Sequence, residues 1–228
     1  MRAIHRRAAI ILVFMLFVAF PVALCAQDVI AYIGASKGDV TVTRSAQGDT
    51  VDASVGMFLH GGDFIKTGEE SYASVIFQDD GSRLILDANT QLTLNATRTE
   101  KKLSKRLSLG GGKMWAKVAK KRGTDFQIST PTTVASVKGT DFVIEELSNP
   151  GETDYWITQD CVQIANAANP DGTIVCEGYK VHATSDSMEI TPFEPGEVPI
   201  APVLQTLIFE FEDKPEGGLQ IQFKGEAE

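Results

Sequence analysis

The stretch SVKGTDFVIE brings a serine and a lysine close together in the sequence. Ser136 and Lys138 would share one face of a strand, and a Ser–Lys pair can act as nucleophile and base without histidine. Nothing nearby supplies an orienting third group or an oxyanion-binding cradle. We therefore interpret Gly139, Thr140 and Asp141 as a structural turn between two strands, in which glycine provides the backbone freedom.

Three other patterns offer weaker chemistry. Gly110 to Lys113 reads GGGK, but Met114 follows where a phosphate loop needs Ser or Thr at a strand-to-helix junction. His60 and His182 are far apart, and the cysteine spacing matches no zinc module. With 30 acidic residues in the chain, some close carboxylate pair is inevitable and has no specificity for glycoside hydrolysis. We expect no catalytic residues, no metal site and no cofactor.

One basic segment stands out in an otherwise acidic chain. Residues 98–122 hold ten Lys or Arg and one Glu, a local charge of 10 − 1 = +9. If the segment forms a hairpin, an aromatic and several cations share a face and could contact a partner or an anionic polymer; these residues are Lys113, Trp115, Lys117, Lys120, Lys121 and Arg122. The alternatives are protection of an exposed sheet edge by lysine, or pairing with the acidic tail after Asp186.

The elements that position these residues are short strands. No window after the first 26 residues sustains a helical period, whereas alternation and turn signals recur. Asp80 and Gly81 form a strong hairpin turn. The apolar residues that alternate on its two strands are Ala73, Val75, Phe77, Leu84 and Leu86. The expected fold class is all-β, with short antiparallel strands in a roll, sandwich or solenoid-like architecture.

A later hairpin has its tip at residues 169–172, which read NPDG. Symmetric pairing about this tip places Cys161 roughly opposite Cys176, and a disulfide between them would close a loop of about 15 residues. Two unpaired thiols are the alternative. A disulfide also suits an oxidising compartment.

The first 26 residues have the pattern of a cleaved secretory signal peptide. Arg2, Arg6 and Arg7 precede an apolar run of about 13 residues and a small-residue end near Ala26. The run is shorter than the roughly 20 residues of a membrane span. Leu24 stands where a lipidation box before Cys25 needs a small residue. We expect a periplasmic or secreted protein without a transmembrane span after cleavage, and its charge of about −12 opposes nucleic-acid binding.

The C-terminal part changes character. Residues 186–202 are rich in proline, which indicates an extended connector. Residues 203–228 then alternate again and predict a terminal β-hairpin, which needs its own domain or a partner to cover its apolar face. The expected division is a signal peptide at 1–26, a β domain at 27–185, this connector and this hairpin.

The motifs in their order resemble the FecR domain, an extracytoplasmic sensing module known from regulators of iron-siderophore uptake. The resemblance runs from about Ser36 to Ser185 and is strongest at FQISTPTTVASVKGTDFVIE. It implies no catalytic role for the Gly139–Asp141 turn and a core position for Phe142.

The best-known relatives of this kind carry a cytoplasmic anti-sigma segment and a transmembrane helix. Here the signal leads almost directly into the domain, so we expect no direct binding of a sigma factor. The resemblance implies a non-enzymatic sensing module that recognises an envelope protein or polymer, with strand addition at an open sheet edge as one route. The alternatives are an anionic-glycan or lipid-headgroup binder that uses residues 98–122, and a structural envelope component.

Overall fold

The computed structural model describes residues 28–45, 48–98, 103–120, 125–147 and 151–199. Within them the chain forms 17 strands and one short 3-10 helix, η1 (Pro195–Glu197), so the expected all-β class is confirmed. The signal peptide at 1–26 and the terminal hairpin at 203–228 lie outside the described residues. No helix in the described part has the length and apolar character needed to cross a membrane.

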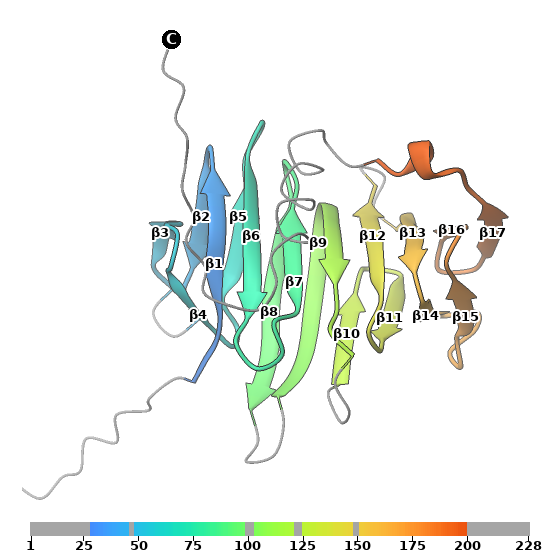
Figure 1. The fold of residues 1–228 in the computed structure, drawn as a ribbon, viewed down its shortest axis with the longest axis horizontal. Helices are drawn as coiled ribbons and strands as arrows, with labels where there is room; N and C mark the ends of the chain where they lie inside the picture. The colour runs from blue at the N-terminus through green and yellow to red at the C-terminus, as the bar shows by residue number, and fades with distance from the viewer. Residues whose placement is uncertain (1–27, 46–47, 99–102, 121–124, 148–150, 200–228) are drawn as a thin grey trace, which may run out of the picture.

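The strands form two layers, which Figure 1 shows as a row of upright strands running from β3 and β4 at one end to β15 and β17 at the other. Sheet A contains, in spatial order, β4 (Phe58–His60), β1 (Val29–Lys37), β6 (Tyr72–Phe77), β7 (Arg83–Leu86), β9 (Leu103–Lys117), β12 (Asp141–Glu146), β13 (Thr153–Gln159), β16 (Tyr179–Ala183) and β17 (Met188–Pro192).

Sheet B forms the second layer. In spatial order it contains β3 (Thr50–Asp52), β2 (Val40–Thr43), β5 (Phe64–Thr67), β8 (Gln91–Arg98), β9, β10 (Asp125–Ser129), β11 (Thr133–Val137), β14 (Cys161–Asn166) and β15 (Thr173–Cys176). The pairings are antiparallel except that of β9 with β10, which is parallel.

β9 belongs to both sheets. Its first part pairs with β8 and β10 in sheet B, and its last residues pair with β7 and β12 in sheet A. The strand changes sheets around Gly112, whose φ of +85° favours glycine; a Cβ there would clash with Thr90. The basic segment therefore does not form a hairpin of its own. It supplies one long internal strand, β9, so the lysines of β9 do not protect a sheet edge.

The core lies between the two sheets and follows the alternating residues of each strand. Phe77, Leu84, Phe126 and Phe142 are all buried in it. Alternation places these side chains inward and their neighbours along each strand outward. The predicted β6–β7 hairpin and the inward position of Phe142 are therefore confirmed.

A disulfide joins the last two strands of sheet B, β14 and β15. Cys161 and Cys176 are bonded and lie directly opposite each other on β14 and β15, as the symmetric hairpin predicted.

The β domain continues past Ser185, because β17 pairs with β16. Thus the first part of the expected connector at 186–202 is a strand; its prolines begin at Pro192, where β17 ends.

Candidate functional site

The outer face of sheet A carries a row of four apolar side chains that do not join the main core. Ile85, Trp115, Val143 and Trp156 come from the adjacent strands β7, β9, β12 and β13 and pack as a separate cluster. Each lies directly opposite the next in the strand register, and directly opposite residues share a face. The chain contains 2 tryptophans, so both are in this row.

The segment that follows β17 covers part of this row. Phe193 and Val198 pack against the four residues, as does Tyr72. The backbone N–H of Phe193 donates a hydrogen bond to the carbonyl of Gly178 (3.0 Å), which directs the chain away from the edge of the sheet. We call residues 193–198 the strap. Trp115 is 7% exposed and Trp156, which also has the Lys180 ammonium over its ring, is 5% exposed, so neither offers an open aromatic surface.

A cavity of about 370 Å³ lies along one side of the row, next to Trp115. It brings together Arg83, Lys117, Asp141 and Asp160 from separate strands and turns. Lys117 Nζ lies 3.3 Å from Asp141 Oδ2. Burial lowers the pKa of Arg83 because it disfavours the charged guanidinium. The cavity therefore has a mixed-charge lining in which cations and carboxylates face each other.

The predicted Gly-Thr-Asp turn forms one wall of the same cavity. Gly139 has φ +78°, and a Cβ at this position would collide with the side chain of Lys120. Thr140 Oγ1 donates to the carbonyl of Cys161 (2.7 Å), which ties the turn to β14. Lys120 Nζ lies 2.7 Å from Asp160 Oδ1. These contacts give the Gly139–Asp141 turn a structural role. The predicted turn at Asp80 and Gly81 also borders the cavity, through Gly81.

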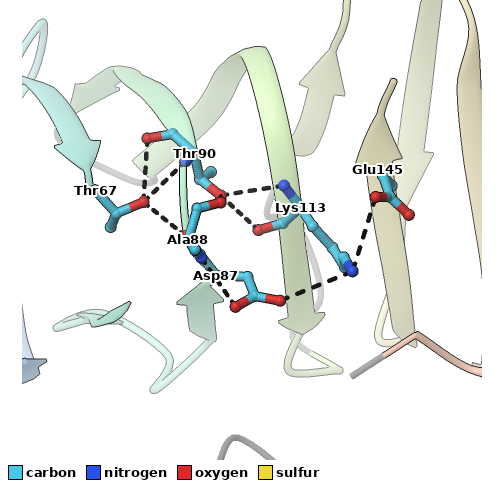
Figure 2. A network of polar contacts seen from close by, with 6 residues as sticks. All are labelled: Thr67, Asp87, Ala88, Thr90, Lys113 and Glu145. Atoms are coloured by element: carbon cyan, nitrogen blue, oxygen red, sulfur yellow. Dashed lines mark hydrogen bonds and ion pairs between the residues drawn. The ribbon is translucent and has the colours of Figure 1, made fainter. Parts of the chain in front are cut away.

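A polar network lies on the other side of the row, and Figure 2 shows its members pointing toward one another from several strands and from the turn after β7. Thr67 Oγ1 donates to the carbonyl of Asp87 (2.6 Å) and accepts the N–H of Thr90 (2.8 Å). Thr90 Oγ1 donates to the carbonyl of Lys113 (2.9 Å). Lys113 Nζ lies between two carboxylates, 3.8 Å from Asp87 and 3.7 Å from Glu145. The GGGK motif thus ends in a lysine held by acidic neighbours.

The residues predicted as an anion surface are therefore only partly assembled. Lys113, Trp115 and Lys117 do share one face, the outer face of sheet A, because they alternate along β9. Trp115 is buried, however, and Lys113 and Lys117 lie near the carboxylates of Asp87 and Asp141 in the same domain. Lys121 and Arg122 lie outside the described residues.

The most buried charge in the described residues was not predicted. Lys105 Nζ lies 2.6 Å from Asp80 Oδ2 and 2.8 Å from Asp79 Oδ1, and its side chain is 0% exposed. It also sits 4.7 Å from the ring centre of Phe77. The signal was present in the sequence, since Lys105 occupies an inward position of the alternating run Leu103–Leu109.

That ion pair explains the electrostatics of the β6–β7 turn. Burial by itself raises the pKa of Asp80, but hydrogen bonds from the Lys105 ammonium and the Ser82 N–H outweigh it, so the pKa lies below its ordinary value. Elsewhere in the core, burial raises the pKa of Tyr155, whose hydroxyl hydrogen-bonds Thr133. The described residues contain no group of three His, Cys, Asp or Glu side chains arranged to hold a metal.

Comparison with known proteins identifies the domain. Residues 63–160 match the family described as FecR protein. This part of the chain, less than half of it, is therefore similar to a FecR domain. The matched range includes every strand that contributes to the apolar row, from β7 to β13. No curated protein sequence matches the chain.

Two crystal structures of a candidate anti-sigma factor from Parabacteroides distasonis ATCC 8503 resemble this chain. The structure at 2.50 Å resolution is 12% identical, with a TM-score of 0.51, over 65% of this chain and 72% of that chain. The structure at 1.65 Å is 14% identical, with a TM-score of 0.49, over 59% of this chain and 62% of that chain, which is less than two thirds of its length. At this identity the likeness concerns the fold.

Proposed function

We propose that this protein is an exported, non-enzymatic sensing module of the FecR type that recognises a protein partner in the cell envelope. The FecR domain supports a sensing or regulatory role. The related fold of the 2.50 Å structure, described as a candidate anti-sigma factor, agrees with that role. Export is supported by the signal-like N-terminus and by a disulfide, which persists in oxidising compartments.

The observation that carries the proposal is the coincidence of the FecR match with the outer face of sheet A. All four residues of the apolar row and the cavity beside Trp115 belong to residues 63–160. The row itself is covered, so the accessible part of this face is the cavity, whose mixed-charge lining resembles the polar rim of a protein interface. We therefore assign partner recognition to this face.

The charge arrangement favours a protein over an anionic polymer. A polymer site needs cations that are available to phosphate, sulfate or carboxylate groups, but Lys113, Lys117 and Lys120 each lie near a carboxylate of the domain. Charge reversal of Lys117 and Lys120 should accordingly leave retention on anionic glycans or lipid vesicles unchanged at low salt. Loss of retention in the double variant would favour the polymer-binding alternative instead.

Photo-crosslinking in intact cells tests the face directly. A photoreactive amino acid replaces Lys117, at the rim of the cavity, and in a matched protein replaces Lys66, which is exposed on the outer face of sheet B. We expect a discrete protein adduct from position 117 and none from position 66. Equal adducts from both positions, or none from either, would contradict recognition through this face.

Export has its own test. The mature protein should be recovered from the periplasm or medium with its N-terminus near Gln27 and with Cys161 and Cys176 oxidised. Recovery of the uncleaved chain in the cytoplasm with reduced cysteines would overturn this part of the proposal without affecting the assignment of the domain.

A further inference from the structure

The C-terminal end of the sandwich exposes residues that point toward the core. Met188 and Ile190 on β17 lie directly opposite Ala183 and Val181 on β16, and these two partners are fully buried in the core. Directly opposite residues share a face, so Met188 and Ile190 point to the inner side of sheet A. Nevertheless Ile190 is 40% exposed. The inner face of β17 therefore lacks the covering layer that buries its neighbours.

The order of the strands explains why this face is uncovered. β15, the last strand of sheet B, lies against β13 and β16 of sheet A. β17 is one strand further out in sheet A than β16. Figure 1 shows β15 and β17 together at this end of the molecule. Sheet A thus extends one strand beyond sheet B.

A further strand of sheet B would lie beside β15 and opposite β17. That position offers both a sheet edge for backbone pairing and apolar side chains to cover. In the described part of the chain β15 pairs only with β14, so its other edge offers backbone N–H and C=O groups. Two exposed side chains of sheet A face that position. They are Ile190 on β17 and Tyr179 at the start of β16, and Tyr179 is 46% exposed. An amphipathic strand would satisfy the edge and cover the apolar side chains together. We call this position the acceptor slot.

We propose that the acceptor slot is filled by residues 205–211 of the same chain. In QTLIFEF the apolar residues Leu207, Phe209 and Phe211 alternate with Ile208 and Glu210. As a strand beside β15, the segment would direct Phe209 toward Ile190 and Glu210 toward solvent. The sequence of the segment has the alternating pattern of an amphipathic strand, which is the form that strand addition requires.

The length of the chain permits this docking. The strap packs on the apolar row, whose farthest strand from β17 is β7. Five strand spacings separate β7 from β17, about 24 Å, and the sheets are about 10 Å apart. Eight residue steps lead from Pro199, the last described residue, to Leu207, and an extended chain covers roughly 26–29 Å in that length. Only three strand spacings, about 14 Å, separate β12 from β17. The segment therefore reaches the slot around the edge of sheet A from β12 or β13 of the row, and tethering gives it an advantage over a segment from another molecule.

Disulfide trapping in the full-length chain tests the proposal. Ile190→Cys is combined with Phe209→Cys, and the matched control combines Thr191→Cys with Phe209→Cys, because Thr191 lies on the opposite face of β17. Under mild oxidation we expect a bond between positions 190 and 209 within one monomer, roughly tenfold more than in the control, as tethering at a fitted distance predicts. Peptide mapping confirms that the Cys161–Cys176 bond is retained.

Other outcomes overturn the proposal. A bond between positions 190 and 209 of two different chains, seen as a doubled mass on a non-reducing gel, would mean that a second copy fills the slot. Equal yields in the two pairs would mean that the segment does not dock there.

Hydrogen exchange provides a test that does not depend on the cysteine variants. In the full chain, Phe209→Ser should speed amide exchange of residues 173–176 on β15 and leave residues 133–137 on β11 unchanged. Unchanged amide exchange on β15 would overturn the proposal. It would mean that the amides on the outer edge of β15 are not hydrogen-bonded to residues 205–211 in the full chain.

Discussion

Lys105 is the residue whose environment most constrains the domain. Its ammonium lies between Asp79 and Asp80 and over the Phe77 ring, with no exposure to solvent. A buried charge is tolerated only when it is paired and hydrogen-bonded, because transfer from water costs several kcal/mol per ion. The pair therefore links the beginning of β9 to the β6–β7 turn and fixes their relative position.

Removal of the cation should be costly. Lys105→Met leaves two buried carboxylates without their counter-charge, so we expect the free energy of unfolding to fall by about 3–5 kcal/mol. Lys66→Met is the matched control, because Lys66 is exposed and should change stability by less than about 0.5 kcal/mol. Denaturant unfolding measures both. A loss in Lys105→Met no larger than in the control would show that the carboxylates can relax into solvent.

The same pair predicts a pH dependence. The pKa of Asp80 is lower in the folded protein than its ordinary value of 3.8. Its contribution to stability is therefore fully present above 3.8 and is lost as the pH falls through the lower folded value. Unfolding measured at a series of pH values below neutrality should show a shallower acid-side loss in Asp80→Asn than in the wild type. Parallel profiles would contradict this assignment of the titrating group.

At the scale of elements, turns with positive φ let the chain change direction or pass from one sheet to the other. The Gly139 turn delivers the chain from β11 in sheet B to β12 in sheet A, and Thr140 anchors it to the carbonyl of Cys161. Gly81 closes the β6–β7 hairpin within sheet A. Both glycines have positive φ. The side chain of Lys120 packs against Gly139, whereas the space around Gly81 is open.

This difference predicts different costs of the same substitution. Gly81→Ala has open space for its Cβ and should cost about 1–2 kcal/mol for the left-handed conformation alone. Gly139→Ala must also displace Lys120, so we expect a further loss of about 1–3 kcal/mol, typical of overpacking. Thermal or denaturant unfolding of the two variants measures the difference. Equal losses would show that Lys120 moves aside without cost.

At the scale of the whole molecule, the two faces of the sandwich differ. The outer face of sheet B presents polar residues such as Gln127, Ser136 and Gln163, while the outer face of sheet A carries the Trp115–Trp156 row under the strap. Two clusters of apolar residues therefore exist, one between the sheets and one beneath residues 193–198. The strap joins the C-terminal part of the chain to the face that we assign to partner recognition.

Tryptophan fluorescence can follow the strap without added labels, because both tryptophans lie beneath it. Phe193→Ala should shift the emission to longer wavelength, increase quenching by acrylamide and cost about 1–2 kcal/mol of stability, since Phe193 is half-buried. Ile174→Ala is the control, because Ile174 is 68% exposed and lies outside this row. Emission unchanged by Phe193→Ala would show that the strap does not shield the row.

The sequence by itself determined the local structure of this protein. Period-two alternation identified the strands and their inward residues, the NPDG tip placed Cys161 opposite Cys176, and glycines marked the turns, because these signals depend on neighbours a few positions away. The ordered motifs also indicated the FecR domain, which the family match over 63–160 confirms.

The tertiary structure alone decided how the strands are shared between sheets and which charges are paired. Register across β7, β9, β12 and β13 brought Ile85, Trp115, Val143 and Trp156 into one row, although they are far apart in the chain. The basic segment was predicted as a possible surface, yet Lys113 lies near the carboxylate of Glu145 on another strand, and Lys105 is buried against Asp80. Long-range pairing set these contacts, because local composition records a charge but not the strand that lies beside it.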